Sequence, residues 1–223
     1  MQFFYHREAG ESSLTIDSEL HKYIFKVRRH NTDETLYFRN LSDKNIYGYS
    51  VTSINRRETI LALESSKEKL IESNKKLHLG WCVVDPKTVE KSIASLNELG
   101  VSKITFIFCK YSQKQFKINF EKLNKILQNS SSQSGRSSII ELDSCDSLKE
   151  FLEQNPNSYM FNFSPNNIKN NSKDINTIVL GCEGGFSSDE IEMFDSSKVV
   201  GVDSSIILRS ETAAISLASH ILQ

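Results

Sequence analysis

The 223-residue chain carries 27 Lys and Arg against 28 Asp and Glu, which gives a formal net charge of −1 at pH 7. This length allows one sizeable core or two smaller domains, and the absence of any apolar run near about 18 residues excludes a membrane span. Because the charges nearly balance, bulk charge does not predict a nucleic-acid partner, and a polyanion would have to be held by a local patch.

The start of the chain and its cysteines indicate a reducing compartment. The first residues lack the small-residue cleavage site that follows the apolar core of a secretory signal, which predicts a cytoplasmic protein. The cysteines are far apart, and three lie in or beside apolar runs: Cys82, Cys109, Cys145 and Cys182. We therefore predict reduced packing residues rather than disulfides or zinc ligands, and no metal.

A short helix is predicted after Asp17, whose side chain can cap it. Its apolar positions share one face: Leu20, Ile24 and Val27. Its cations fall on the opposite face and form a basic stripe: Lys22, Lys26 and Arg29. The stripe is either a surface that binds a polyanion or an ordinary solvated face.

Three segments rich in aromatic and β-branched residues follow this helix. They predict strands over residues 35–39, 45–51 and 58–63, separated by turn residues. One helix with several short strands is typical of a small antiparallel barrel. The polar, charged stretch over 64–76 predicts a domain junction near 65–76.

From residue 77 onward, buried strands alternate with amphipathic helices. A strand over 77–84 leads into Asp85-Pro86, an N-cap followed by a first-turn proline, and Gly100 ends the helix. Further strands are predicted over 101–109, 138–142, 158–163, 176–181 and 198–202. Further helices are predicted over 116–127 and 147–154, after Ser187 and from Ser210. This alternation is typical of an α/β domain with a mainly parallel sheet covered on both faces.

The strand that ends at Leu180 runs into a glycine loop, Gly181-Cys182-Glu183-Gly184-Gly185. The loop lacks the spacing of a dinucleotide or P-loop site, so it is either a tight turn or a place where bare backbone approaches a ligand. Ser187-x-x-Glu190 is a capping box, which predicts a helix directly after it. Further on, Arg209 and Glu211 stand between an apolar run and a helix start, where opposite charges need each other, water or a ligand.

Five motifs carry a family resemblance, in this order: His21 with Val27-Arg28, Glu98-Leu99-Gly100-Val101, Gln133-Ser134-Gly135-Arg136, Gly181-Cys182-Glu183-Gly184-Gly185-Phe186 and Ile207-Leu208-Arg209-Ser210-Glu211-Thr212-Ala213. Through them the chain resembles the RsmE family of small-subunit ribosomal RNA uridine N3-methyltransferases, in the SPOUT superfamily. The resemblance implies a PUA-like β-barrel over residues 1–70 that engages RNA. It also implies a SPOUT domain over 71–223 that ends in a trefoil knot, binds S-adenosylmethionine and forms a homodimer.

The resemblance implies 16S ribosomal RNA, within the small subunit, as the partner, and it assigns candidate residues. Those for the cofactor are Leu180, Gly181, Glu183, Gly184, Gly185, Val202, Ile207, Leu208, Ser210 and Thr212. Those for RNA are Lys22, Lys26, Arg28, Arg29 and Arg136. Uridine N3 must lose a proton when it is methylated, so Arg209 is the candidate cation beside O2 or O4, and Glu211 its orienting partner or a base.

Alternatives stay open at this point. The pair of Arg209 and Glu211 either takes part in chemistry or only ties the loop to the last helix. At the level of the whole chain, two rival functions are a non-catalytic RNA-binding ribosome-assembly factor and a SPOUT methyltransferase that acts at another RNA position.

Overall fold

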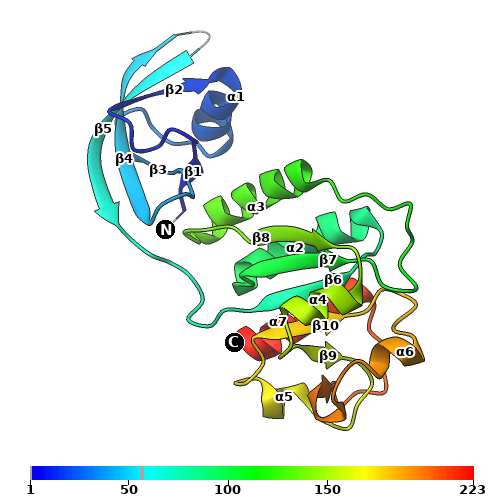
Figure 1. Cartoon of the computed structure of the whole chain (residues 1–223). Coiled ribbons are helices and arrows are strands. Elements are labelled where there is room, and N and C mark those ends of the chain that lie inside the picture. Colours follow the sequence, from blue (N-terminus) through cyan, green and yellow to red (C-terminus); the bar gives the residue numbers. More distant parts are fainter. Residues whose placement is uncertain (1, 56–57) are drawn as a thin grey trace. The chain divides into compact units, whose positions relative to one another are not determined.

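The computed structural model describes residues 2–55 and 58–223 (Figure 1). They form two compact units. The first consists of Met1–Glu72 with Ser131–Ser138, and the second of Ser73–Ser130 with Ile139–Gln223. Each unit has its own cluster of buried hydrophobic residues.

The first unit is built on one curved five-stranded sheet (Figure 1). Its strands follow the order β1-β3-β4-β5-β2. Their bounds are β1 Phe4–Tyr5, β2 Ser13–Asp17, β3 Leu36–Arg39, β4 Asn45–Ile54 and β5 Glu58–Glu68. The three strands predicted in this region are confirmed. The alternation of buried and exposed residues in β2 turns Leu14 and Ile16 into the core.

Strand β5 corrects the predicted domain junction. It pairs with β4 as far as Glu68, opposite Asn45, so the junction predicted near 65–76 begins inside a strand. Residues 64–68 are all exposed, which is why a polar stretch of strand had the composition of a linker.

The first helix also departs from its prediction. Asp17 caps helix α1 (Ser18–His21) as expected, because its carboxylate accepts from the Leu20 N–H at 2.8 Å. The chain then continues as a π-helix over Lys22–Val27, in which the Arg28 N–H donates to the Tyr23 carbonyl. Since i→i+5 bonding widens the turn, Val27 rotates out to 60% exposure while Ile24 stays buried.

The widened turn breaks up the predicted basic stripe. Lys22 and Lys26 lie exposed on the π-helix, but Arg29 follows its end with a φ of 59°. Three cations spaced for one α-helical face therefore do not share such a face. The Arg28 guanidinium instead donates to Gln2 Oε1 at 2.6 Å and lies over the Tyr23 ring.

The second unit contains the predicted parallel sheet. Its six strands follow the order β11-β9-β10-β6-β7-β8, and every neighbouring pair described is parallel. Their bounds are β6 His78–Cys82, β7 Lys103–Ile107, β8 Glu141–Cys145, β9 Tyr159–Phe161, β10 Thr177–Leu180 and β11 Val199–Val200. In β6, four consecutive residues up to Cys82 are buried, as expected for a strand covered on both faces.

Helices join or follow these strands. They are α2 Pro86–Leu99, α3 Phe120–Ser134, α4 Leu148–Gln154, α5 Ile168–Asn171, α6 Ser188–Ile191 and α7 Ser210–Leu222, with a 3₁₀ turn at Ser196–Lys198. The predicted limits of α2 are confirmed, since Asp85 caps it and Gly100 ends it with a φ of 100°. Helix α3 starts later than predicted, because Phe116 packs against the core from the preceding loop. None of the described helices is both long and apolar enough for a membrane crossing.

The cysteine prediction is wrong for two of the four residues. Cys82 at the end of β6 and Cys109 just after β7 form a disulfide, with their Cα atoms 5.7 Å apart. Neighbouring parallel strands bring together two residues that are 27 positions apart, which spacing alone does not reveal. Cys145 and Cys182 are buried free thiols, as expected.

Candidate functional site

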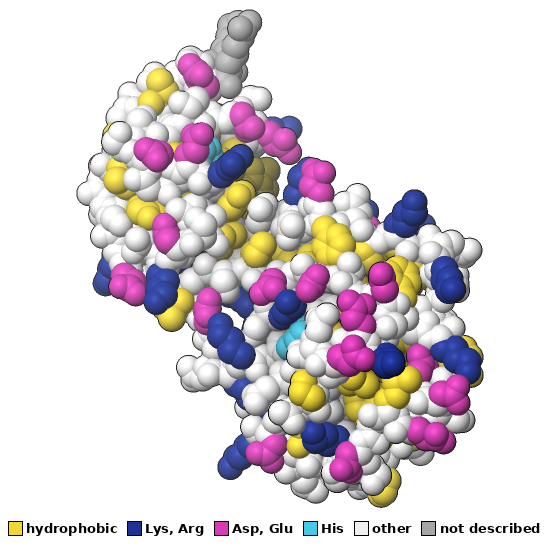
Figure 2. Space-filling view, in the orientation of Figure 1, with side chains coloured by type: hydrophobic (Ala, Val, Ile, Leu, Met, Phe, Trp, Pro, Cys, Tyr) yellow, Lys and Arg dark blue, Asp and Glu magenta, His cyan; other side chains and the backbone are white. Residues whose placement is uncertain are grey.

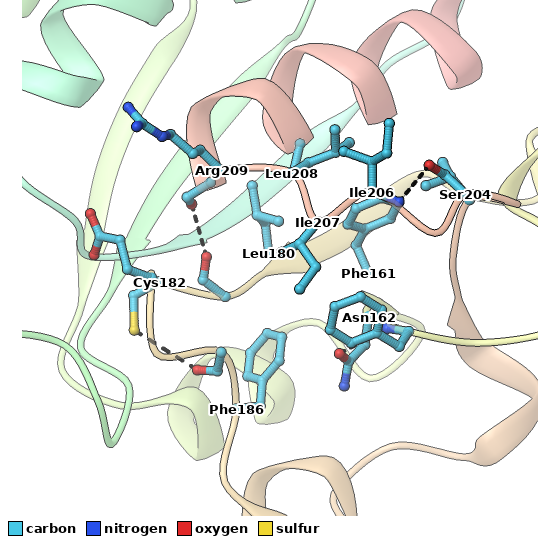
Figure 3. Close-up of a pocket in the computed structure, with 17 residues that line it drawn as sticks. Phe161, Asn162, Leu180, Cys182, Phe186, Ser204, Ile206, Ile207, Leu208 and Arg209 are labelled. Atoms are coloured by element: carbon cyan, nitrogen blue, oxygen red, sulfur yellow. Dashed lines mark hydrogen bonds between the residues drawn. The ribbon is translucent and has the colours of Figure 1, made fainter.

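A cavity of about 320 Å³ opens at the carboxyl ends of strands β9, β10 and β11 (Figure 3). Ligands in open α/β sheets bind at this edge. The walls come from three segments that are distant in the sequence. They are Phe161, Asn162 and Phe163 at the end of β9; Leu180, Gly181, Cys182, Glu183, Gly185 and Phe186 at the end of β10; and Val202, Ser204, Ile206, Ile207, Leu208, Arg209, Ser210 and Ala213 around the start of α7.

The glycine loop forms one wall by folding back on itself. The Gly185 N–H donates to the Cys182 carbonyl at 2.9 Å, and Gly185 has a φ of 68°. A Cβ on Gly181 would lie 3.2 Å from Gly185 Cα, a tight contact, and the positive φ of Gly185 is strained for other residues, so the turn favours glycine at both positions. The loop is therefore a tight turn and also lines a cavity.

Gly184 faces away from this cavity. A Cβ there would lie 2.9 Å from the Cβ of Tyr111, in the loop after β7. The glycine lets the two loops approach closely, and it is not among the lining residues. Its predicted contact with the cofactor stays a prediction.

Glu190 fixes the far end of the glycine loop. The predicted capping box is confirmed, because Ser187 and Glu190 bond to each other's backbone at the start of α6. The buried Glu190 carboxylate also accepts the backbone N–H of Lys110 at 2.8 Å. One side chain thus holds the glycine loop, α6 and the loop after β7 together.

Ser210 joins two walls of the cavity. Its hydroxyl donates to the Gly181 carbonyl at 2.9 Å and accepts from the Trp81 indole at 2.9 Å. Because both bonds are buried, this hydroxyl positions the glycine loop against α7. Only the backbone of Ser210 is therefore left to contact a ligand.

Arg209 stands at the rim of the cavity. Its side chain is exposed and points away from the apolar side chains of Phe161 and Phe186 (Figure 3). Among the described residues it has no ion-pair partner. Glu211 does not line the cavity, and two residues apart at a helix start do not face each other, so the expected pairing of Arg209 with Glu211 is absent. Thr212 is exposed and likewise lies outside the lining.

Sequence reasoning missed the wall after β9. Phe161 and Asn162 line the cavity because β9 is the parallel neighbour of β10, a pairing that sequence spacing does not reveal. Gly201 after β11 locks this wall, since a Cβ there would lie 2.7 Å from the Asn162 carbonyl oxygen. The sequence signal available for this wall was the apolar character of the strand ends that lie beside the glycine loop.

The remaining polar groups of the site offer no metal centre. Burial raises the pKa of the Cys182 thiol, which keeps it protonated at neutral pH. No cluster of three or more His, Cys, Asp or Glu within residues 2–55 and 58–223 is arranged to hold a metal ion.

Comparison with known proteins decides the family. Residues 71–222 match the RNA methyltransferase domain family. The chain is 32% identical over 222 residues to the ribosomal RNA small subunit methyltransferase E of Helicobacter pylori J99, and 98% of each chain is covered. The chain belongs to the RsmE family.

Solved structures show the same fold. A methyltransferase from Legionella pneumophila, solved with S-adenosylmethionine, superposes with a TM-score of 0.80 at 23% identity and covers 99% of this chain and 95% of its own. The ribosomal RNA small subunit methyltransferase E of Neisseria gonorrhoeae, also bound to S-adenosylmethionine, gives 0.76 at 18% identity over 98% and 95%.

In this RsmE-family chain, the predicted RNA-binding residues belong to the first unit and differ in exposure. Lys22, Lys26 and Arg29 are exposed, whereas Arg28 is half-buried. Arg136 is only 7% exposed, and burial lowers the pKa of its guanidinium. Arg136 thus supports the packing of the first unit and is not presented on its surface.

Proposed function

We propose that this chain uses S-adenosylmethionine to methylate N3 of a uridine in 16S ribosomal RNA, as a cytoplasmic homodimer. The observation that carries the proposal is the cavity in which the glycine loop meets the segment around Arg209, in a chain of the RsmE family. The PUA-like character of the first unit and a trefoil knot in the second belong to the same proposal. Both follow from the family resemblance.

The cavity suits a ligand with an aromatic ring, an aliphatic chain and several polar groups. Its volume lies at the lower end of the roughly 300–1,000 Å³ range of small-molecule sites. Apolar side chains supply most of the wall: Phe161, Leu180, Phe186, Val202, Ile207 and Leu208. Backbone groups of Gly181, Glu183, Gly185 and Ser210 add hydrogen-bond partners, so these residues would hold S-adenosylmethionine.

When bound, S-adenosylmethionine supplies an electrophilic methyl group, and the protein has to align the uridine and manage its N3 proton. We assign to Arg209 the stabilisation of the negative charge that develops on O2 or O4 when N3 loses its proton. Its side chain is exposed at the rim and has no competing ion pair among the described residues. A cation beside the developing charge lowers the barrier of the chemical step.

Two carboxylates compete for the role of base. Glu183 lines the cavity, and Glu211 lies in the first turn of α7, two residues after Arg209 and outside the lining. We assign the proton to Glu211 because it belongs to the same family motif as Arg209, although the two side chains do not face each other. Glu183 is assigned to the cofactor.

The rim of the cavity supports the homodimer. Three large apolar side chains stand exposed there: Phe163 at 78%, Ile206 at 72% and Ile207 at 76%. Apolar side chains gathered in this way mark interaction surfaces. A second copy of the chain covering them would also seal the cavity from water.

The deciding experiment is methyl transfer to ribosomal RNA from a strain that lacks this activity. The chain is incubated with methyl-labelled S-adenosylmethionine and either naked 16S RNA or assembled small subunits, and the product is mapped by nucleoside mass spectrometry. We expect 3-methyluridine at one site. Cofactor binding without transfer would favour the assembly factor, and a label at another position would favour a different SPOUT specificity.

A further inference from the structure

A second local concentration of positive charge, besides the one at residues 22–29, lies in the second unit. Residues 110–125 contain five lysines and one acidic residue, in a chain whose net charge is −1. The lysines are Lys110, Lys114, Lys117, Lys122 and Lys125, and the acid is Glu121. Lys and Arg side chains are spaced along the side of the molecule where the segment between β7 and α3 runs (Figures 1 and 2). None of these residues was assigned a function from the sequence.

Ion pairs separate these lysines into two groups. Lys110 pairs with Asp189 at 3.4 Å, Lys122 with Glu90 at 2.6 Å and Lys125 with Glu121 at 3.0 Å. Lys114 and Lys117 are exposed and have no acidic partner within the described part of the chain. Their charges are therefore available to a phosphate.

Tyr111 presents an aromatic ring in the same segment as these lysines. Its side chain is 51% exposed although its Cβ lies against Gly184 of the glycine loop. An exposed ring next to unpaired lysines is the combination that binds single-stranded RNA, since bases stack on the ring and lysines hold phosphates.

The turn that carries Tyr111 is held from three sides. Cys109 is bonded to Cys82, and the Ser112 N–H donates to the Cys109 carbonyl at 3.0 Å. The Ser112 hydroxyl accepts the Cys109 N–H at 3.2 Å, and the Lys110 N–H donates to Glu190. Because this turn is already fixed, a base that stacks on the ring loses little free energy to ordering of the protein.

We propose that residues 110–117 form an RNA-contact surface of the second unit, with Tyr111 stacking on an unpaired base that flanks the target uridine and Lys114 and Lys117 binding the adjoining phosphates. The inference rests on the proposed function. Methylation at N3 needs the Watson–Crick edge of the uridine free, so the target lies in an unpaired stretch whose neighbouring bases are open to stacking. Contact between Tyr111 and Gly184 places that base on the outer side of the glycine loop, whose other side lines the cofactor cavity.

The test measures binding of a fluorescent 16S RNA fragment at several salt concentrations. Lys114→Gln with Lys117→Gln should reduce the log–log salt slope by about 1.4 to 1.8, at roughly 0.7 to 0.9 per phosphate contact. The control is Lys169→Gln with Lys173→Gln, which removes the same charge from exposed residues in and after α5 and should leave the slope unchanged.

Two substitutions of Tyr111 isolate stacking. Tyr111→Leu keeps the Cβ and Cγ atoms that approach Gly184 but removes the ring, and it should weaken RNA binding by about 5- to 150-fold. Tyr111→Phe keeps the ring and should bind within about twofold of the native chain. S-adenosylmethionine affinity, measured by calorimetry, should stay the same in both.

The outcomes separate this inference from the proposed function. The proposed contact surface is wrong if the lysine variant keeps the salt slope of the native chain, or if Tyr111→Leu keeps its RNA affinity. Either result holds even if the chain methylates uridine N3. If the chain binds the fragment through these residues but does not methylate it, the contact surface stands and the proposed function falls.

Discussion

Removing the hydroxyl of Ser210 should destabilise the second unit strongly for so small a change. Ser210→Ala leaves the Trp81 N–H and the Gly181 carbonyl without the partners they now have at 2.9 Å, and all three residues are buried. Each of these two unsatisfied buried groups costs about 1 to 3 kcal/mol, so we expect a loss of about 2 to 6 kcal/mol in the free energy of unfolding. Urea denaturation followed by the fluorescence of Trp81, the single tryptophan, measures this directly.

The same substitution should reach the cofactor. The Ser210 hydroxyl holds the glycine loop against α7, so its loss should weaken S-adenosylmethionine binding by about tenfold, or roughly 1.4 kcal/mol. Ser216→Ala in the same helix is the matched control and should change stability by no more than about 0.5 kcal/mol. If Ser210→Ala costs no more than that control, the two buried bonds are not formed in solution and the account of the cavity walls is incorrect.

Three further predictions concern chemistry and pH. Arg209→Ala should slow single-turnover methyl transfer by roughly 100-fold or more with little change in cofactor affinity, whereas a large affinity loss at native rate would make Arg209 a cofactor ligand. Glu211→Gln should slow transfer by about 100-fold, as expected for a lost base, while Glu183→Gln should mainly weaken cofactor binding; the reverse result exchanges their roles. Burial, followed by the charge of Lys103, lowers the pKa of His78 to about 4. The unfolded chain, with a His pKa near about 6.5, therefore binds more protons between these values, and stability falls as pH drops through this window. His78→Gln should flatten the pH dependence of the urea midpoint there, and an unchanged slope would show that His78 does not titrate in this way.

Local signals predicted the second unit well because its elements are bounded by residues with local roles. Asp85 and Gly100 set the limits of α2 through a side-chain cap and a left-handed turn, and both act within a few residues of their own position. The capping box of Ser187 and Glu190 is local in the same sense. The alternation of strands and helices then predicted a parallel sheet without knowledge of any long-range contact.

The errors arose where a non-local contact or an unusual helix changed the outcome. Val27 occupies a position that an α-helix would bury, and only the change to π-helical bonding exposes it. Cys82 and Cys109 meet because β6 and β7 are neighbours, and Phe161 reaches the cavity because β9 lies beside β10. Such pairings follow from strand order, which a single sequence does not encode in its spacing.

The difference between local and non-local contacts also determines which positions are sensitive to mutation. The motif residues that line the cavity were visible in the sequence, but the contacts that hold them in place span 129 positions from Trp81 to Ser210 and 80 from Lys110 to Glu190. Because these supports set the distance between the cavity walls, substitutions at Trp81 or Glu190 should weaken cofactor binding although neither lines the cavity. Gly184 also acts outside the cavity: its missing side chain leaves room for Tyr111, and it does not line the cavity. A motif of consecutive glycines thus combines two functions: Gly181 and Gly185 shape the turn at the cavity, and Gly184 joins that turn to the loop on which we place the RNA.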